Sequence, residues 1–145
     1  MHGNGTHKDP HGNEYEGQFA NGKYSGEGRM DFHGGGLYRG EWHEGMRHGS
    51  GTQENADGSC YLGQFKLGLL HGKGRMNYLD GSYYDGEWHE NKQHGQGTYK
   101  KANGDVYAGS FCNGKYHGQG KISFIRQPGH THDSFYIGEW SNGKR

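Results

Sequence analysis

The sequence predicts an all-β protein: one elongated, solenoid-like antiparallel sheet, built as a meander of successive β-hairpins. Three observations predict it. Tyrosine recurs every 23 residues, glycine follows each tyrosine by two residues, and an aromatic ring follows it by four. Glycine at such short intervals would cost a helix about 1 kcal/mol each relative to alanine. Residues one, three and five of a strand, in contrast, share one face.

Rows of equivalent residues define the repeat. The tyrosine row has five members 23 residues apart and a sixth after 29: Tyr15, Tyr38, Tyr61, Tyr84, Tyr107 and Tyr136. The ring row is Phe19, Trp42, Phe65, Trp88, Phe111 and Trp140. A further glycine row is Gly12, Gly35, Gly58, Gly81 and Gly104. We expect the tyrosine and ring rows to form the core and to line the surface that holds a partner.

The elements follow in chain order as copies of one hairpin. In the second copy, Tyr38, Gly40 and Trp42 share a strand face, "HEGM" forms a four-residue turn, and the chain returns through "RHGSG". Pairing across this turn predicts Gly40 opposite Gly49, Tyr38 opposite Gly51 and Glu41 opposite His48. One face then carries rings packed on glycine backbone, and the other face is polar.

The whole chain divides into units of this kind. The expected units are a partial one at 1–14, repeats at 15–37, 38–60, 61–83, 84–106 and 107–135, the last with a six-residue insertion, and a partial unit at 136–145. A single hairpin is marginally stable, so the units must stack to bury their rings. With strands about 4.8 Å apart, each unit adds roughly 10 Å of length.

The unit, written Y-x-G-E/Q-W/F-x-x-G-K-x-H-G-x-G, resembles the MORN (membrane occupation and recognition nexus) repeat over nearly the whole chain. Departures are few: Asn91 replaces a turn glycine, "KLGLLHG" lacks the basic turn residue, and the insertion precedes Tyr136. Proteins of that family include radial-spoke-head components, protist cytoskeletal scaffolds and membrane-tethering junctional proteins. Some lipid kinases and a lysine methyltransferase also carry the repeat, but their catalytic domains have no counterpart here.

Composition restricts the function classes. Sixteen basic and sixteen acidic residues give no net charge, so no overall field favours nucleic acid. The chain lacks an apolar run suited to a signal peptide or membrane span, and Cys60 and Cys112 define no disulfide framework. We therefore expect a soluble, cytoplasmic protein.

Catalytic and cofactor sites are not expected. "GQFANGKY" and "GSFCNGKY" imitate a phosphate loop, but Tyr24 and Tyr116 stand where Ser or Thr would bind magnesium. No triad or carboxylate pair stands out from the repeat. We predict a non-enzyme without cofactor or metal.

Histidines are the most tempting ligands. His48, His71, His94 and His117 recur at the repeat spacing, too far apart for neighbours to share one ion. We expect each to pair with the facing residue: Glu41, Gln64, Glu87 and Ser110. His130, His132 and Asp133 in the insertion could coordinate a metal with a fourth ligand, or belong to an exposed loop.

Basic residues follow most of the turns. If aligned, they form a row along one edge of the sheet: Lys23, Arg47, Lys92, Lys115 and Lys144. Such a row would contact anionic phospholipid headgroups; the alternative is a set of solvated turn charges.

These observations favour a scaffold that holds protein partners in an aromatic-glycine trough. The resemblance implies an axonemal, radial-spoke-like or cytoskeletal assembly of a cilium or flagellum, and the alternative is a peripheral membrane adaptor. The chain opens and closes on half-units, which could be completed head to tail by another copy or by a partner's strand; frayed ends or a longer parent protein are the other interpretations.

Overall fold

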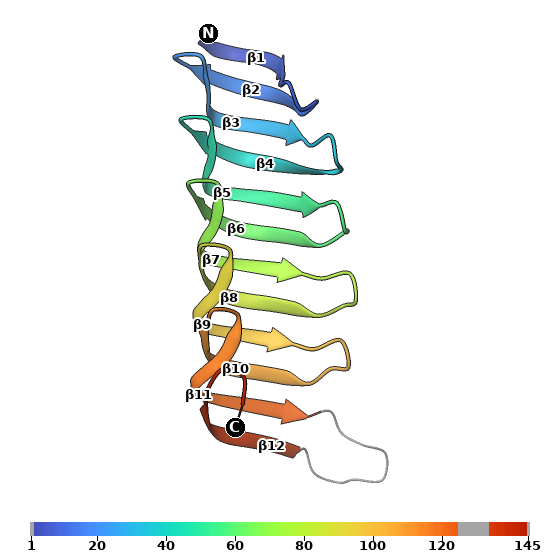
Figure 1. Cartoon of the computed structure of the whole chain (residues 1–145), viewed down its shortest axis with the longest axis vertical. Coiled ribbons are helices and arrows are strands. Elements are labelled where there is room, and N and C mark those ends of the chain that lie inside the picture. The colour runs from blue at the N-terminus through green and yellow to red at the C-terminus, as the bar shows by residue number, and fades with distance from the viewer. Residues whose placement is uncertain (1, 125–133, 145) are drawn as a thin grey trace.

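Twelve strands form one antiparallel sheet in which every strand pairs with its neighbours in the sequence (Figure 1). This computed structural model describes residues 2–124 and 134–144. The strands are β1 (Gly3–Lys8), β2 (Glu14–Ala20), β3 (Lys23–Asp31), β4 (Gly36–His43), β5 (Met46–Asn55), β6 (Cys60–Lys66), β7 (Leu69–Asn77), β8 (Tyr83–His89), β9 (Lys92–Lys100), β10 (Val106–Cys112), β11 (Lys115–Phe124) and β12 (Ser134–Trp140). The all-β, single-sheet prediction is confirmed. Within the described residues, no helix is long and apolar enough to cross a bilayer.

Two kinds of connection alternate along the chain and lie on opposite long edges of the sheet (Figure 1). One edge, the turn rim, consists of two-residue turns and the residue after each: 21–23, 44–46, 67–69, 90–92, 113–115 and 142–144. The other edge, the loop rim, consists of the longer loops 9–13, 32–35, 56–59, 78–82 and 101–105. Each of the four units between residues 15 and 106 therefore contributes one turn and one loop to the same two edges.

The turns are tighter than the expected four residues, because both central residues adopt left-handed backbone. In the second unit Glu44 has φ 51° and Gly45 has φ 80°, the conformation that matches the twist of a hairpin. At the turn where glycine is missing, Asn91 takes φ 70°, which asparagine tolerates better than most residues.

The strand register differs from the predicted one beyond the first pairs. Trp42 lies opposite Arg47, as continuation from the turn requires, but the next pair is Gly40 with Gly51. Residues 48–50 therefore face Glu41 alone, in a bulge that the left-handed Gly49, φ 71°, permits. The predicted pairs Gly40–Gly49 and Glu41–His48 are wrong.

Tyr38 was expected opposite Gly51 but pairs with Gln53. Its ring nevertheless lies over Gly51, because a Cβ added there would collide with ring atoms. The same displacement recurs in the first, third and fifth units, where the register also shifts across the bulge.

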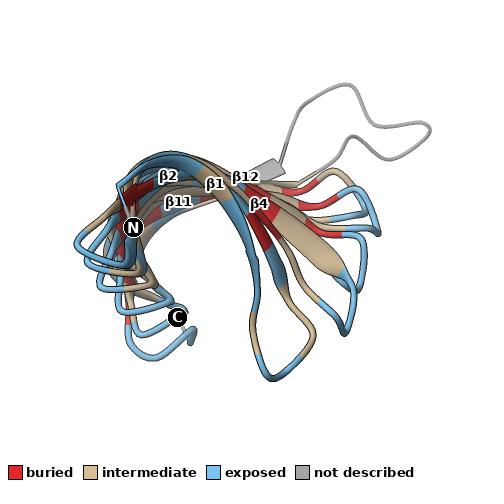
Figure 2. Cartoon of the chain, turned by 90° about the horizontal axis from the view of Figure 1, so that it is seen from above, coloured by how far each residue is buried: buried red, intermediate tan, exposed pale blue. Residues whose placement is uncertain are grey.

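The bulges occur at one place in every hairpin, and a bulge bends its strand. Seen from its end, the whole sheet is accordingly bent into an arch (Figure 2). The side chains of the ring row and tyrosine row lie on the concave side, which we call the trough. The opposite, convex side is called the outer face.

The core is a continuous series of aromatic rings in edge-to-face contact on the trough side. Tyr38 meets the ring of Trp42 in its own unit at 5.1 Å and that of Phe65 in the next unit at 5.1 Å, both edge to face. The largest fully buried side chains of the described residues are Tyr15, Tyr38, Tyr61, Tyr84 and Tyr107. The buried members of the ring row are Phe19, Trp42, Phe65, Trp88, Phe111 and Trp140. Tyr136 is partly buried and packs against this core.

Candidate interaction surface: the trough and its rims

A second layer of side chains covers the buried rings and lines the trough. Its partly buried members are Tyr24, Phe32, Leu70, Tyr78, Tyr99, Tyr116 and Phe124. Tyr24 stacks on Tyr15 at 3.9 Å, and Tyr116 stacks on Tyr107 at 3.8 Å. Because the rings of the core are buried, the trough offers these outer rings to a partner. The tyrosines of the second layer follow no single row of the repeat, so sequence reasoning missed most of them.

The positions of Tyr24 and Tyr116 show what the two segments that imitate a phosphate loop, "GQFANGKY" and "GSFCNGKY", form in the structure. Both tyrosines are packed on core rings inside hairpins, and neither loop lies between a strand and a helix. The segments are therefore β-turns of the repeat.

One hollow of the trough lies in its second half, between the two rims. It has a volume of about 490 Å³ and is lined by Tyr78, Asp80, Ser82, Gln93, Tyr99, Phe111, Lys115 and Tyr116, with Gly114 and Gly143 at the turns. Asp80 belongs to the loop rim and Lys115 to the turn rim, so the hollow has opposite charges on its two sides and aromatic rings between them. Four of its ten lining residues are aromatic, and a hollow of this size that combines rings with a few polar groups is typical of binding sites.

The acidic side of the trough is organised by the loops. Hydrogen bonds from Ser82 hold the pKa of Asp80 below its usual value, and Ser59 does the same for Asp57. In each loop the serine donates both its N–H and its hydroxyl to one carboxylate oxygen, at 2.8 and 2.6 Å for Asp57. These carboxylates are consequently ionised at neutral pH.

Arg47 does not belong to the predicted basic row. The lysines of that row come directly after their turns, whereas Arg47 comes one residue later. Its side chain therefore points into the trough rather than along the rim. The guanidinium lies 5.6 Å from the Phe65 ring centre and donates to Gln53 Oε1 and Gly68 O at 2.7 and 2.8 Å. Burial lowers the pKa of Arg47. The reason for the error is a shift of one position in a strand, which reverses the face.

The turn rim itself carries lysine and apolar residues at one equivalent position. In order, these residues are Lys23, Met46, Leu69, Lys92, Lys115 and Lys144. Lys23 is paired with Glu44 of the next turn at 3.1 Å. The basic row thus exists only at both ends of the rim, with apolar residues between them.

The predicted partners of the histidine row are wrong. Glu41 Oε2 accepts the backbone N–H of Ser50 inside the bulge, Gln64 accepts that of Lys73, and Glu87 accepts that of Gln96. In the fifth unit, Ser110 Oγ accepts a hydrogen bond from Gln96 Nε2 at 2.7 Å. The bulge explains these hydrogen bonds. It leaves one backbone N–H without a partner on the neighbouring strand, and it turns the side chain of Glu41, Gln64 or Glu87 toward that N–H.

Three imidazoles of the row, those of His48, His71 and His94, instead contact histidines that come one residue before the turns. Ring centroids are 5.5 Å apart for His43 and His48, 5.2 Å for His71 and His89, and 5.8 Å for His89 and His94. His43 and His89 were missed as members of this group. The signal was present in the sequence, as "WHE" in two units, but only the sheet brings these side chains to the row.

The remaining candidate metal ligands and the two cysteines do not form a site among the described residues. Among residues 2–124 and 134–144, no three His, Cys, Asp or Glu side chains already converge as metal ligands would. His130, His132 and Asp133 lie outside the described residues. Cys60 and Cys112 are free thiols, and burial raises the pKa of Cys60, which makes its thiol less reactive.

Fold and surface together define a class: a repeat protein of stacked β-hairpins that presents an extended trough and two long rims. The profile of the MORN repeat matches residues 15–37, 38–60, 61–83, 84–106, 107–125 and 136–145. The chain therefore belongs to the MORN repeat family, whose repeats form modules for protein or membrane interaction. The comparison with curated proteins gives no significant match.

Proposed function

We propose that this protein is a non-catalytic scaffold whose trough holds a segment of a partner protein. The observation that carries the proposal is the hollow of about 490 Å³, with half-buried tyrosines on its floor and opposite charges on its rims. Tyrosine is enriched at protein interfaces because its ring contributes buried area and its hydroxyl a hydrogen bond. Asp80 and Lys115 would fix the direction of a bound segment.

The setting we propose is an axonemal, radial-spoke-like or other cytoskeletal assembly in the cytoplasm. Two features support it: the described chain is made almost entirely of repeats, and its surface is long and regular. Such a shape suits a structural element that contacts several neighbours along one line.

Variants in the hollow test the scaffold. Tyr78→Asp with Tyr99→Asp places two carboxylates on the trough floor, and we expect partners captured from extracts of ciliated cells to be lost. The matched control is Leu62→Asp, because Leu62 is 60% exposed on the outer face. Equal capture by both variants, with both still folded by far-ultraviolet circular dichroism, would contradict binding through the trough.

Location is tested separately. A tagged full chain expressed in ciliated cells should remain with axonemes or cytoskeleton after detergent extraction. Complete release into the detergent-soluble fraction would count against the assembly we propose.

A second candidate, a peripheral membrane adaptor, is favoured by the composition of the turn rim. Met46 and Leu67 are 40% and 61% exposed there, with lysines on both sides. Apolar side chains that enter the headgroup region and lysines that meet anionic lipid would act together.

Flotation with vesicles containing phosphatidylserine separates the candidates. The adaptor requires salt-sensitive flotation that disappears when Lys23, Lys92 and Lys115 are changed to Glu. The control with the same charge change away from the turn rim is Lys8, Lys73 and Lys100 to Glu. Identical flotation of the two variants would exclude lipid binding by this rim.

A further inference from the structure

The side chain of Arg47 fills a place in the trough of the second unit. Its guanidinium lies 6.0 Å from the ring centre of Phe32 and 5.6 Å from that of Phe65. It donates to Gln53 Oε1 at 2.7 Å and to Gly68 O at 2.8 Å. Two rings and two oxygen acceptors thus hold one guanidinium, a combination that suits this planar cation.

The same arrangement recurs two units further along the chain, without the arginine. The residues 46 positions after the four contacts of Arg47 all line the hollow of about 490 Å³: Tyr78, Phe111, Tyr99 and Gly114. Two rings are again accompanied by two oxygens that can accept hydrogen bonds, a phenol and a backbone carbonyl. Gln93 stands at the position of Arg47 and lines the same hollow with a shorter side chain. The hollow therefore corresponds to the place that the Arg47 guanidinium fills.

The charges of the hollow also suit a guanidinium. Asp80 lines it, at a position where the earlier copy has Gly34. Ser82 donates its N–H and its hydroxyl to Oδ1 of Asp80, which leaves Oδ2 to receive a cation in a charge-assisted hydrogen bond. Lys115 lines the hollow as well, but it is exposed, so its long side chain can turn the charge to solvent.

We propose that the hollow binds an arginine side chain of the partner protein, in the way that the second unit holds Arg47. The proposal rests on the scaffold function above and names the side chain that the trough recognises. The guanidinium lies against the rings of Tyr78 and Phe111. It donates to the carbonyl of Gly114 and pairs with Asp80. Lysine fits less well, because its ammonium group is a point charge and not a planar fork that stacks and donates together.

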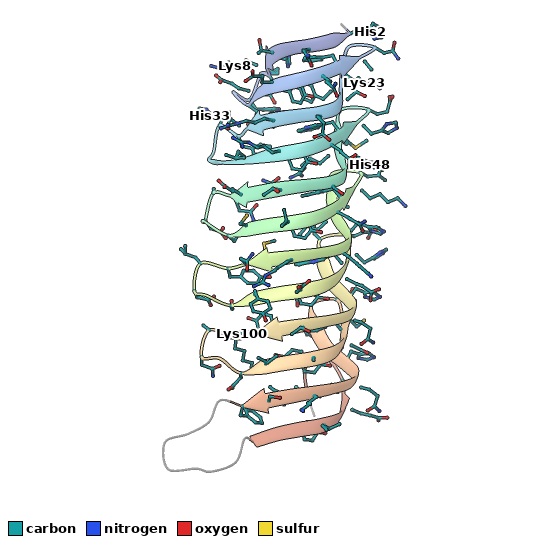
Figure 3. The ribbon with its side chains drawn as sticks, turned by 180° about the vertical axis from the view of Figure 1, so that it is seen from behind. His2, Lys8, Lys23, His33, His48 and Lys100 are labelled. Carbon is teal, nitrogen blue, oxygen red and sulfur yellow. The ribbon has the colours of Figure 1, made fainter. Side chains whose placement is uncertain are left out.

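Two residues near the hollow provide matched controls. Asp57 accepts the same pair of hydrogen bonds from Ser59 in the preceding loop, but the carboxylate that lines the hollow is that of Asp80. Lys100 follows Tyr99 in β9 and is labelled in Figure 3, which views the outer face, because successive residues of a strand face opposite sides. Changes of charge at Asp57 and Lys100 therefore leave the lining intact.

Side-chain NMR titration of the full chain with short capped peptides tests the site. The probe is acetyl-Gly-Arg-Gly-amide, and the comparison peptides carry citrulline, lysine or trimethyllysine in place of arginine. We expect the arginine peptide to shift the ring resonances of Tyr78, Tyr99 and Phe111 saturably. Citrulline lacks the charge, so its peptide should bind about tenfold or more weakly. No saturable shift, equal affinity for the citrulline peptide, or equal or tighter binding of the lysine or trimethyllysine peptide would each overturn the proposal.

Variants assign the binding to the hollow. Gln93→Arg places a guanidinium there from the chain itself, so it should abolish binding of the arginine peptide and keep the fold, as the copy with Arg47 does. Asp80→Asn should weaken the peptide about tenfold, whereas Asp57→Asn and Lys100→Gln should change its affinity less than about twofold. Undiminished binding to Gln93→Arg, or equal losses for Asp80→Asn and Asp57→Asn, would overturn the proposal.

Capture from extracts of ciliated cells separates this proposal from the scaffold function. Loss of the partner from both Gln93→Arg and the variant with Tyr78→Asp and Tyr99→Asp supports the two together. Loss from the double aspartate variant alone shows that the trough binds its partner without an arginine in the hollow, which overturns the present proposal and leaves the scaffold standing. Capture by both variants contradicts the two together.

Discussion

Glycine and tyrosine act as a pair at the level of single residues. The glycine row in the second strand of each hairpin, for example Gly51, is covered by a tyrosine ring, so any side chain there would collide with it. This contact explains how a chain that is only 28% hydrophobic forms a core. The bare backbone supplies one wall of the core, and the ring supplies the other.

Gly51→Ala tests this pair. The methyl group would displace the Tyr38 ring, and overpacking of this kind costs about 1–3 kcal/mol. Urea unfolding followed by circular dichroism should show that loss. Gly34→Ala is the control, because a Cβ at Gly34 meets nothing within 4 Å; equal stability of the two variants would argue against the packing described.

Leu67 is poorly suited to its turn. It has φ 52°, and a left-handed conformation costs an ordinary residue about 1–2 kcal/mol. Other units place asparagine at the same position, as Asn21 and Asn113. The side chain is 61% exposed, so little packing would be lost on replacement.

We therefore expect Leu67→Asn to raise the free energy of unfolding by about 1 kcal/mol. The midpoint of urea unfolding measures the change. Leu62→Asn, equally exposed but in a strand, should give no gain, and a lower midpoint for Leu67→Asn than for the wild type would contradict the argument.

Within each hairpin, the bulge is the element that shapes the protein. It releases a carbonyl and an N–H from the ladder, and both find partners. In the third unit the Tyr61 hydroxyl donates to Gln64 O at 2.8 Å, while Gln64 Oε1 accepts from Lys73 N at 2.9 Å. The tyrosine row thus has two roles, a core ring and a donor to the bulged strand.

Tyr61→Phe separates these roles. The ring remains, but the Gln64 carbonyl loses the donor of a partly buried hydrogen bond, which should cost about 0.5–1.5 kcal/mol. Thermal or urea unfolding measures the loss. Tyr83→Phe serves as the control, because the Tyr83 ring lies under Arg75 at 3.9 Å and that contact survives the change. No difference between the two variants would show that the hydroxyl is dispensable.

Across the whole molecule, neighbouring units are joined along the turn rim as well as through the sheet. The turn N–H of each unit donates to a carbonyl of the preceding one, as Gly45 does to Tyr24 and Gly68 to Arg47, both at 3.0 Å. With edge-to-face ring contacts along the core, these bonds make each unit depend on its neighbours.

Burial raises the pKa of Tyr15, Tyr61 and Tyr116 from 10.0 to about 12, and it raises that of Tyr38 and Tyr84 as well. Above pH 10 the unfolded chain loses these protons while the folded chain keeps them, so the unfolded state binds fewer protons. Stability is therefore complete below pH 10 and falls as the pH rises towards 12.

Urea unfolding at several alkaline pH values should show this decline, together with a part of the tyrosinate absorbance that appears only as the protein unfolds. A free energy of unfolding that stays constant up to pH 12, or tyrosinate absorbance that reaches its full value at pH 10 in the folded protein, would contradict it.

The trough could be predicted only in part from the sequence. The period identified its floor, since Tyr38 and Trp42 must share a face. The second layer was recognised only in part, because its rings occupy different positions of the unit, as Tyr78 and Tyr99 do, and meet only where the arch brings the strands together. The opposite charges of Asp80 and Lys115 are likewise adjacent to one hollow only after bending.

What the sequence determined by itself is the architecture: the hairpin unit, its repetition in a single sheet and the identity of the core rings. These follow from a strand period of two and a repeat period of 23, both local properties. The tertiary structure decided the register beyond the bulge, the inward side of Arg47 and the contact of His89 with His71 and His94. Those depend on the left-handed glycine of each bulge and on the neighbouring unit, and a shift of one position in a strand moves every side chain to the other face.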